Sequence, residues 1–304
     1  MILSLKDIKK VLILGCGTLG TRVGLRFALS GYLVKMYDID EKIFISAQKT
    51  QDQLLQYLVK NNLLAPQHVD KVTDRISWTL SPEEAAYDAD LINESVTEDV
   101  EVKLRVWKQF GALSPEHTIF TTNTSYLLPS MFAEISGRPE RFCAYHFHDV
   151  FYARVVDIMP HANTEKWVVD LLIQLGPVLD QIPVYIEKES PGYIFNYMLM
   201  SVLGSAGALL TNGTGSVEAI DKSWMGNLKT EIGPFGILDA VGLDTAWHVV
   251  KKYKDDKSKR FAILLKQMIE KGKLGVKSGE GFYHYPNPRF KEPDFLGDKP
   301  CEEL

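Results

Sequence analysis

Two histidines two positions apart, His146 and His148, are the residues of this sequence best suited to acid–base chemistry. They lie in an apolar segment expected to be a strand, on which residues two apart share a face. Histidine moves a proton near neutral pH, and a base of this kind needs an acceptor that fixes its tautomer. Asp157 follows eleven residues after His146, in the next expected strand. The pattern favours His146 as a general base that Asp157 orients across a hairpin.

Two other interpretations of this histidine pair are open. The pair could hold a metal ion, but a third ligand is needed and Asp149 points to the opposite face of the strand. The pair could also be ordinary core histidines with satisfied hydrogen bonds. We predict acid–base chemistry and no metal.

Polar residues elsewhere could complete such a site. Thr121–Ser125 follows an expected strand, so it lies at the carboxyl edge of the sheet, where ligands bind in open α/β folds; it could equally cap a helix at 129–134. Asn196 falls in an apolar helix, where a buried amide needs a polar partner or a ligand. Glu98 and Lys103 could form a surface ion pair or face a cofactor.

The elements that must position these residues begin with an apolar run, 10–14, that ends in Gly15-Cys16-Gly17-Thr18-Leu19-Gly20. This G-x-G-x-x-G pattern predicts a strand, a tight turn and a helix N-terminus that receives a pyrophosphate. Gly15 permits the turn, Gly17 leaves room for the phosphates, and Gly20 lets helix and strand pack closely.

Asp38 ends a second apolar segment about twenty residues further on. There a carboxylate binds the two ribose hydroxyls and repels a 2′-phosphate, so NAD is favoured over NADP. The alternative is a strand–helix–strand unit that binds nothing.

Strand and helix patterns alternate up to residue 188 and helix patterns dominate afterwards, at 191–211, 216–227, 235–252 and 258–271. We therefore predict an α/β fold: a Rossmann-type doubly wound sheet followed by an all-α C-terminal domain. The expected domains are 1–188, with a helical arm at 41–73, then 189–285, then an extended, loosely packed tail at 286–304. Thr164 is expected to cap a helix that Gly176-Pro177 stops.

The helix at 191–211 is apolar nearly all round, which suits the core of a small domain or a subunit interface. We expect it to serve both, in a homodimer.

Composition narrows the class of protein. The 304 residues carry a net charge of −5, which argues against nucleic acid as a partner. No apolar run is long enough for a membrane span, and no secretory signal pattern precedes the first strand. Three distant cysteines, Cys16, Cys143 and Cys301, form neither a disulfide framework nor a metal spacing. We expect a cytoplasmic protein.

Taken together, the motifs resemble those of the L-3-hydroxyacyl-CoA dehydrogenase family, including the related β-diketo-ester reductases. The resemblance runs from about residue 8 to residue 285. It rests on ordered blocks: the glycine turn, Tyr37-Asp38-Ile39, Glu94-Ser95-Val96-Thr97-Glu98 with Lys103, Thr122-Asn123-Thr124-Ser125, Arg138-Pro139-Glu140-Arg141 with His146-Phe147, Ser190-Pro191-Gly192-Tyr193-Ile194-Phe195-Asn196, Gly233-Pro234-Phe235 with Asp239 and Val241-Gly242-Leu243-Asp244-Thr245, and Lys277-Ser278-Gly279-Glu280-Gly281-Phe282-Tyr283.

The resemblance implies a dimeric, NAD-dependent enzyme of fatty acid metabolism that interconverts 3-hydroxyacyl and 3-oxoacyl substrates, possibly CoA thioesters. It implies that His146 is the base in oxidation and the acid in reduction, with Asp157 at the position of its orienting acid. Ser125 and Asn196 would hold the substrate oxygen. The residues implied for the cofactor are Gly15, Gly17, Thr18, Leu19, Gly20, Asp38, Glu98, Lys103, Asn123 and Lys277.

The sequence departs from this family in three places. Asp157 and Asp149 stand where Glu and Asn are usual, and the intervening segment, Asp149-Val150-Phe151-Tyr152-Ala153-Arg154, is one residue shorter. Phe151, Tyr152 and Arg154 replace a proline-rich turn. The arm at 41–60 has only three lysines, which weakens the case for coenzyme A.

These departures keep two alternatives open. One is the same chemistry on a substrate without CoA: a β-diketo ester or acid, or a sugar acid such as gulonate, whose carboxylate Arg154 is suited to meet. The other is a non-catalytic NAD-binding sensor.

Overall fold

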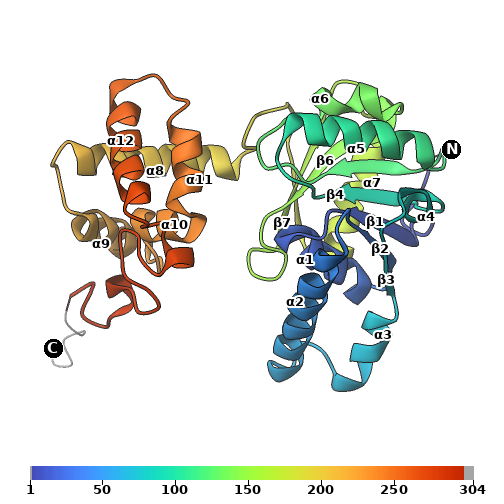
Figure 1. Ribbon diagram of the computed structural model, residues 1–304, viewed down its shortest axis with the longest axis horizontal. Coiled ribbons are helices and arrows are strands. Elements are labelled where there is room, and N and C mark those ends of the chain that lie inside the picture. Colours follow the sequence, from blue (N-terminus) through green and yellow to red (C-terminus); the bar gives the residue numbers. More distant parts are fainter. Residues whose placement is uncertain (1, 298–304) are drawn as a thin grey trace. The chain divides into compact units, whose positions relative to one another are not determined.

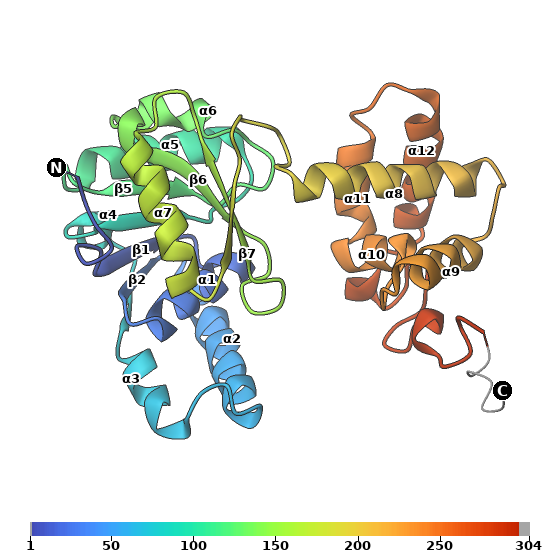
Figure 2. The ribbon, with the colours of Figure 1, turned by 180° about the vertical axis from the view of Figure 1, so that it is seen from behind.

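The computed structural model describes residues 2–297, which form two compact units that divide after Ile194 (Figures 1 and 2). The division falls six residues beyond the expected boundary at 188. Tyr193 accounts for the difference, because its ring is buried in the first unit and packs on His146.

The first unit is built on an eight-stranded sheet in the order β3-β2-β1-β4-β5-β6-β7-β8. Strands β1 to β6 are parallel, β7 is antiparallel to β6, and β8 is parallel to β7. The order reverses between β1 and β4, where ligands bind in doubly wound folds. The strands are β1 (Lys10–Leu14), β2 (Leu33–Tyr37), β3 (Ile76–Thr79), β4 (Leu91–Glu94), β5 (Ile119–Thr122), β6 (Phe142–Phe147), β7 (Val155–Pro160) and β8 (Ile182–Tyr185).

Helices cover both faces of this sheet, and alternate residues of β1 pack into the two cores. Val11 and Ile13 pack with α1 (Thr18–Leu29) and α7 (Lys166–Val178) on one face. On the other face, Leu12 and Leu14 pack with α4 (Pro82–Ala86), α5 (Val100–Leu113) and α6 (Ser130–Ala133). The remaining α-helices of this unit are α2 (Glu41–Lys60) and α3 (Val69–Thr73). Helices α2 and α3 form the expected arm, which projects below the sheet in Figure 1.

Helix α7 differs from the expectation at both ends. It begins after Glu165, while the Thr164 hydroxyl donates to the carbonyl of Phe142 and caps nothing. It runs through Gly176-Pro177 to Val178. Pro177 lies in the last turn, where it removes a single backbone bond, and Gly176 before it has no Cβ to clash with the proline ring.

The second unit is helical, with α8 (Phe195–Thr211), α9 (Val217–Leu228), α10 (Pro234–Val241), α11 (Leu243–Val250) and α12 (Asp256–Glu270). The helix expected at 235–252 is two helices, because Gly242 adopts a φ of 96° and breaks the backbone bonding between them. The fold therefore confirms the predicted class, a Rossmann-type sheet followed by helices.

The C-terminal tail packs more closely than expected as far as it is described. Phe290 and Phe295 are buried in the core of the second unit, beside the short 3₁₀ turn Arg289–Lys291. The rest of the predicted tail, 298–304, lies outside the described residues.

Two buried carboxylates hold the segment 275–285 against the second unit. Asp239 accepts hydrogen bonds from the backbone N–H groups of Phe282 and Tyr283, each at 2.8 Å. Asp221 accepts from the Tyr283 hydroxyl and from two N–H groups at the start of α10. A Cβ on Gly281 would lie 2.0 Å from the Asp239 carboxylate, so this glycine is required for packing.

Among the residues described, no helix combines the length and apolarity that crossing a membrane requires.

Candidate active site

The predicted polar residues of the first unit gather at the carboxyl edge of its sheet. The glycine turn follows β1, Ser95 and Glu98 follow β4, Asn123 and Ser125 follow β5, and His146 lies near the end of β6. Because these strands are parallel and adjacent, their ends meet at one edge, beside the point where the strand order reverses.

The glycine turn has the shape that the pattern predicts. Gly15 has a φ of 92°, and a Cβ on Gly20 would lie 2.0 Å from the carbonyl oxygen of Gly15. At Gly17, by contrast, nothing lies within 4 Å of the position that a Cβ would take. Gly17 and Thr18 are exposed at the N-terminus of α1, while Leu19 is half-buried behind them. This open helix start fits a dinucleotide pyrophosphate.

Asp38 lies just beyond β2 and contacts the glycine turn directly. Its Oδ2 accepts a hydrogen bond of 2.8 Å from the backbone N–H of Cys16, and its Oδ1 accepts one of 2.7 Å from the N–H of Ile39. These bonds fix the carboxylate at the end of β2, beside the turn. A ribose that follows the pyrophosphate would meet a negative charge there, which fits NAD.

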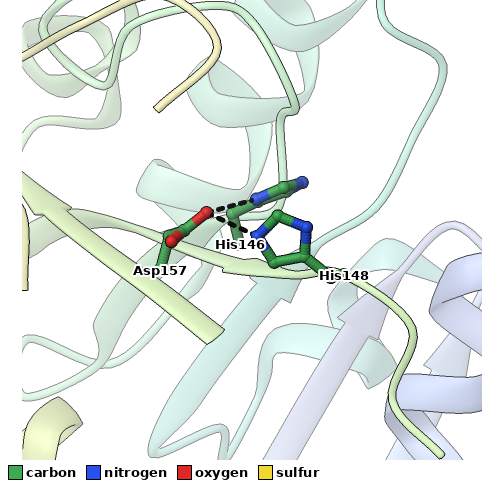
Figure 3. Close-up of side chains that lie close together, drawn as sticks. All are labelled: His146, His148 and Asp157. Carbon is green, nitrogen blue, oxygen red and sulfur yellow. Dashed lines mark hydrogen bonds and ion pairs between the residues drawn. The ribbon is translucent and has the colours of Figure 1, made fainter. Parts of the chain in front are cut away.

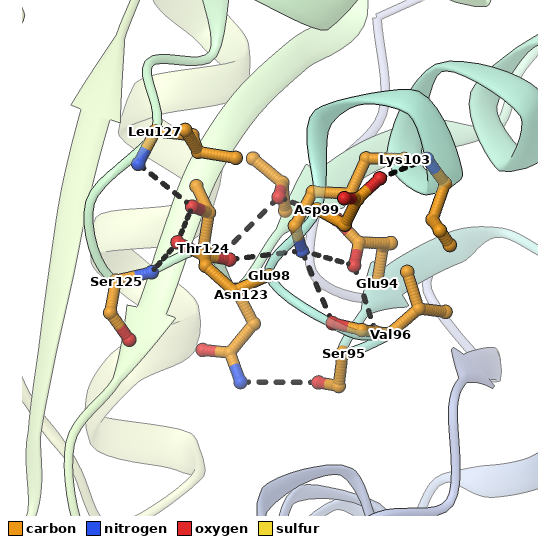
Figure 4. A network of polar contacts seen from close by, with 12 residues as sticks. Glu94, Ser95, Val96, Glu98, Asp99, Lys103, Asn123, Thr124, Ser125 and Leu127 are labelled. Carbon is orange, nitrogen blue, oxygen red and sulfur yellow. Dashed lines mark hydrogen bonds and ion pairs between the residues drawn. The ribbon is translucent and has the colours of Figure 1, made fainter. Parts of the chain in front are cut away.

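Glu98 and Lys103 belong to a polar network that links β4, α5 and the loop after β5 (Figure 4). Lys103 lies 2.6 Å from the Glu94 carboxylate and 3.3 Å from that of Glu98. Its side chain is only 1% exposed, so the pair is not the surface ion pair considered from the sequence. Glu98 in turn accepts from the backbone N–H groups of Ser125 and Tyr126, each at 3.1 Å. Lys103 thus supports the loop that carries Ser125.

Asn123 and Ser125 lie on this loop in different surroundings. The Asn123 amide oxygen accepts from the Phe147 N–H at 2.7 Å, and its nitrogen donates to the Ser95 hydroxyl at 3.1 Å. Asn123 therefore ties the ends of β4, β5 and β6 together. Ser125 is exposed beyond it.

His146 and Asp157 are paired in register across β6 and β7. Nδ1 of His146 lies 3.1 Å from Oδ2 of Asp157 (Figure 3), and both side chains are almost fully buried. The aspartate side chain is therefore long enough to contact the histidine. Burial lowers the pKa of His146, partly opposed by the bond to Asp157. Burial also tends to raise the pKa of Asp157, but hydrogen bonds from His146 and His148 outweigh it and the pKa is lowered.

His148 joins His146 and Asp157 in one cluster, a contact that the sequence analysis did not predict. Its Nε2 lies 2.8 Å from the same oxygen, Oδ2 of Asp157, and its ring contacts His146 edge to face at 4.6 Å. The two-residue spacing that puts both histidines on one face was the signal, and the antiparallel neighbour β7 supplies the third group.

Tyr193 stands in one of the quoted sequence blocks, but the sequence assigned it no role. Its ring stacks on His146, with centroids 4.6 Å apart and planes 17° apart, and its hydroxyl donates to the carbonyl of Thr124 at 2.7 Å. Burial, with Asp157 and Glu98 nearby, holds the pKa of the hydroxyl well above its usual value, so the group stays a donor. Tyr193 has a φ of 56°, a strained value for a tyrosine at a functional site.

The unusual segment after His148 is fixed by contacts within the first unit. Asp149 accepts two bonds of 3.0 Å from Arg22 and also accepts from the N–H groups of Phe151 and Tyr152. Arg154 donates to Asp180 at 2.7 Å. Arg154 thus already has a carboxylate partner, which weakens the argument for a sugar-acid substrate.

Asn196 and Lys277 both lie in the second unit. Asn196 is the second residue of α8 and is half-buried rather than buried. Lys277 is exposed and lies 2.6 Å from Asp244. Their expected roles toward substrate and cofactor stay predictions.

A glycine turn at the switch point, next to a buried histidine–carboxylate pair, is the arrangement of a dinucleotide-dependent oxidoreductase. Comparison with known proteins identifies the family. Residues 10–190 match the model of the 3-hydroxyacyl-CoA dehydrogenase NAD-binding domain, and residues 192–285 match that of the 3-hydroxyacyl-CoA dehydrogenase C-terminal domain. The chain belongs to the 3-hydroxyacyl-CoA dehydrogenase family and is an NAD-dependent oxidoreductase of that type.

Individual relatives span nearly the whole chain. The pig mitochondrial hydroxyacyl-coenzyme A dehydrogenase is 28% identical over 288 residues, covering 91% of each chain. A diketoreductase structure is 34% identical with a TM-score of 0.84, covering 91% of this chain and 99% of its own. The (S)-3-hydroxybutyryl-CoA dehydrogenase of Ralstonia eutropha is 28% identical with a TM-score of 0.84, covering 92% of this chain and 100% of its own.

Proposed function

We propose that this chain oxidises a 3-hydroxyacyl substrate and reduces its 3-oxo counterpart with His146 as the group that moves the proton. The in-register contact of His146 with Asp157, at 3.1 Å, carries this proposal. Because the carboxylate only accepts, it holds the proton of a neutral His146 on Nδ1 and leaves the Nε2 lone pair for the substrate.

In oxidation Nε2 of His146 takes the proton of the substrate hydroxyl, and in reduction it returns a proton to the oxygen. Bound NAD supplies the acceptor or donor of the hydride. Asp157 stabilises the imidazolium formed in oxidation, and the stacked ring of Tyr193 keeps the imidazole plane in place. We assign Ser125 and Asn196 to the substrate oxygen, as hydrogen-bond donors to the charge that develops there.

The cofactor is assigned to the glycine turn and to the groups around it. The N-terminus of α1, with Gly15, Gly17, Thr18, Leu19 and Gly20, receives the pyrophosphate, and Asp38 receives the adenosine ribose. Glu98, Asn123, Lys103 and Lys277 are assigned to the remainder of the cofactor site. The buried contacts of Lys103 support an indirect part for it, through Glu98.

A 3-hydroxyacyl-CoA thioester is the first candidate substrate, and with it a part in fatty acid metabolism. The second is a dicarbonyl compound without CoA. The 34% identity to a diketoreductase favours the second, as do the three widely spaced lysines of α2, Lys42, Lys49 and Lys60.

A substrate screen tests these proposals. NADH oxidation is followed with acetoacetyl-CoA, with free 3-oxo acids and with β-diketo esters, at equal concentrations. Turnover of the thioester alone supports the first substrate, and turnover of the free dicarbonyl compounds alone supports the second. NADH binding without turnover of any of them would overturn the proposed activity and leave a sensor.

We also propose a homodimer through the helical unit. On α8 the apolar side chains of Phe195, Tyr197 and Met198 are at least half exposed, which is unusual for a surface that stays in water. An open groove of about 750 Å³ with Trp224 and Leu228 in its wall lies beside α8 and α9. Light scattering should give twice the chain mass, and a monomer at all concentrations would contradict the proposal.

A cytoplasmic location is proposed from the cysteines. Cys16 and Cys143 are buried free thiols, a state that a reducing compartment preserves. Cell fractionation tests it, and recovery in a secreted or organellar fraction would contradict it.

A further inference from the structure

One carboxylate oxygen of Asp157 contacts the imidazoles of both His146 and His148. The acid–base role needs only the contact with His146. Nδ1 of His146 lies 3.1 Å and Nε2 of His148 lies 2.8 Å from the same Oδ2 (Figure 3). All three donor atoms lie within 4.8 Å of one another. Two imidazole nitrogens and a carboxylate oxygen thus converge on one point between β6 and β7.

The geometry of this cluster is close to that of a zinc centre. Zn²⁺ binds imidazole nitrogen and carboxylate oxygen at about 2.0–2.2 Å, so ligand atoms of a tetrahedral centre are separated by about 3.4 Å. The two nitrogen–oxygen separations here, 3.1 and 2.8 Å, need to widen slightly. The nitrogen–nitrogen separation is bounded at 4.8 Å, and rotation of the His148 ring would bring it to the tetrahedral value. Three protein ligands with a fourth position open is a common zinc arrangement.

The strands hold the donors in place before any ion arrives. His146 and His148 share one face of β6 and its extension, and Asp157 is the direct neighbour of His146 on β7. The stacked ring of Tyr193 restrains His146 further. The His148 side chain is 12% exposed, against 4% for His146 and 2% for Asp157, so the cluster is open to solvent on the His148 side.

We propose that His146, His148 and Asp157 form a reversible binding site for one zinc-type divalent cation, and that its occupancy switches the enzyme off. The cation takes the place of the two protons that the histidines direct at Asp157. When both rings are neutral, each proton moves to the other nitrogen of its ring, Nε2 in His146 and Nδ1 in His148. No proton is then released.

The inhibitory effect rests on the proposed function and follows from the proton position. With the cation on Nδ1, the Nε2 atom of His146 carries the hydrogen and has no lone pair for a substrate hydroxyl. In the reductive direction, loss of that hydrogen would leave an imidazolate, so proton donation is disfavoured as well. Metal binding itself does not depend on any turnover, so the two claims are tested separately.

Binding is tested on the full-length, tag-free chain treated with EDTA and then titrated with Co²⁺ or Zn²⁺. We expect one Co²⁺ per chain, a visible absorption spectrum changed from that of the aqueous ion, and its displacement by one Zn²⁺. His148→Gln is the diagnostic variant, because glutamine can still donate to Asp157 but is a poor zinc ligand. Its affinity should fall by about tenfold or more.

His117→Gln is the matched control, since His117 also contacts an aspartate, Asp90, at 3.1 Å but belongs to no group of three possible ligands within residues 2–297. It should bind Co²⁺ like the unaltered chain. For each protein we take the ratio of activity with Zn²⁺ to activity without it. This ratio should be well below one for the unaltered chain and for His117→Gln, and EDTA should restore the activity of both. For His148→Gln the ratio should stay close to one.

Each outcome decides one claim. Absence of Co²⁺ binding, or equal binding by His148→Gln and the unaltered chain, would overturn the metal site. Binding that depends on His148 but leaves the activity ratio at one would overturn the switch and keep the site. A chain without turnover on any substrate contradicts the proposed function, and the Co²⁺ spectrum still tests the site.

Discussion

His146 and Asp157 are direct neighbours on two antiparallel strands, and Nδ1 of the histidine lies 3.1 Å from Oδ2 of the aspartate. The contact is buried and the carboxylate carries the charge that the imidazolium needs. Asp157→Asn removes that charge while keeping the size, so kcat should fall by about 10²-fold or more with NADH affinity retained. Steady-state kinetics and NADH titration measure both. The kcat of Asp157→Glu should lie between that of Asp157→Asn and that of the unaltered enzyme. A kcat of Asp157→Asn equal to that of the unaltered enzyme would refute the orienting role.

Tyr193 is expected to position His146 through its ring and the loop of Ser125 through its hydroxyl. Tyr193→Ala removes both contacts and should lower kcat by roughly 10- to 100-fold, because small displacements of a catalytic group are costly. Tyr193→Phe keeps the stacked ring and should recover most of that kcat. It should lose about 1 kcal/mol of stability with the bond to Thr124. If phenylalanine and alanine lower kcat equally, stacking is not what matters.

The second and third glycines of the turn, Gly17 and Gly20, should respond differently to one added methyl group. At Gly17 the position of a Cβ is empty, so Gly17→Ala should fold normally but bind NADH more weakly, because the methyl group occupies space left for the pyrophosphate. At Gly20 the Cβ would lie 2.0 Å from a backbone oxygen, so Gly20→Ala should lower the melting temperature as well. Thermal melts and NADH titrations distinguish the two effects. Unchanged NADH affinity in Gly17→Ala would place the pyrophosphate elsewhere.

The buried carboxyl of Asp221 predicts a defined pH dependence of stability. Burial raises the pKa of this carboxyl in the folded state above its usual value. Its contribution to the free energy of unfolding is therefore complete below about pH 4 and is lost as the pH rises through the folded-state pKa. The difference in unfolding free energy between the unaltered chain and Asp221→Asn should fall from pH 4 upward, measured by urea unfolding.

Asp255 provides a control of opposite sign in the same unit. Its hydrogen bonds from Ser258 lower its pKa, so its contribution is present above the unfolded-state pKa and is lost as the pH falls through the folded-state pKa. The difference between the unaltered chain and Asp255→Asn should therefore rise with pH. Parallel trends for the two variants would contradict the assigned origin of these shifts.

Local patterns were enough to predict much of the fold. The helix at 41–60 and the strands on either side of the glycine turn follow from apolar spacing and glycine positions, and the structure has them at these places. The predicted end of α7 at Gly176-Pro177 was wrong, because a proline in the last turn removes only one backbone hydrogen bond. The single helix expected at 235–252 was wrong because the left-handed backbone of Gly242 is not visible in apolar periodicity.

The residues of the candidate site also fall into those that local patterns predict and those that they do not. The pairing of His146 with Asp157 was predictable, since it needs only two strands and a hairpin. Tyr193 was not, because its contact with His146 joins residues 47 positions apart without any periodic signal. Lys103 looked like a surface residue beside Glu98, and only the packing of α5 on the sheet shows that it is buried with Glu94.

Replacement of His146 by glutamine tests the central claim most directly. Glutamine can still hydrogen-bond but cannot accept and return a proton near neutral pH. We predict that His146→Gln loses kcat by about 10²- to 10⁴-fold on the best substrate of the screen. Its dissociation constant for NADH, measured by fluorescence titration, should stay within about twofold of the unaltered value. Turnover at the unaltered rate, with NADH bound equally well, would contradict the account.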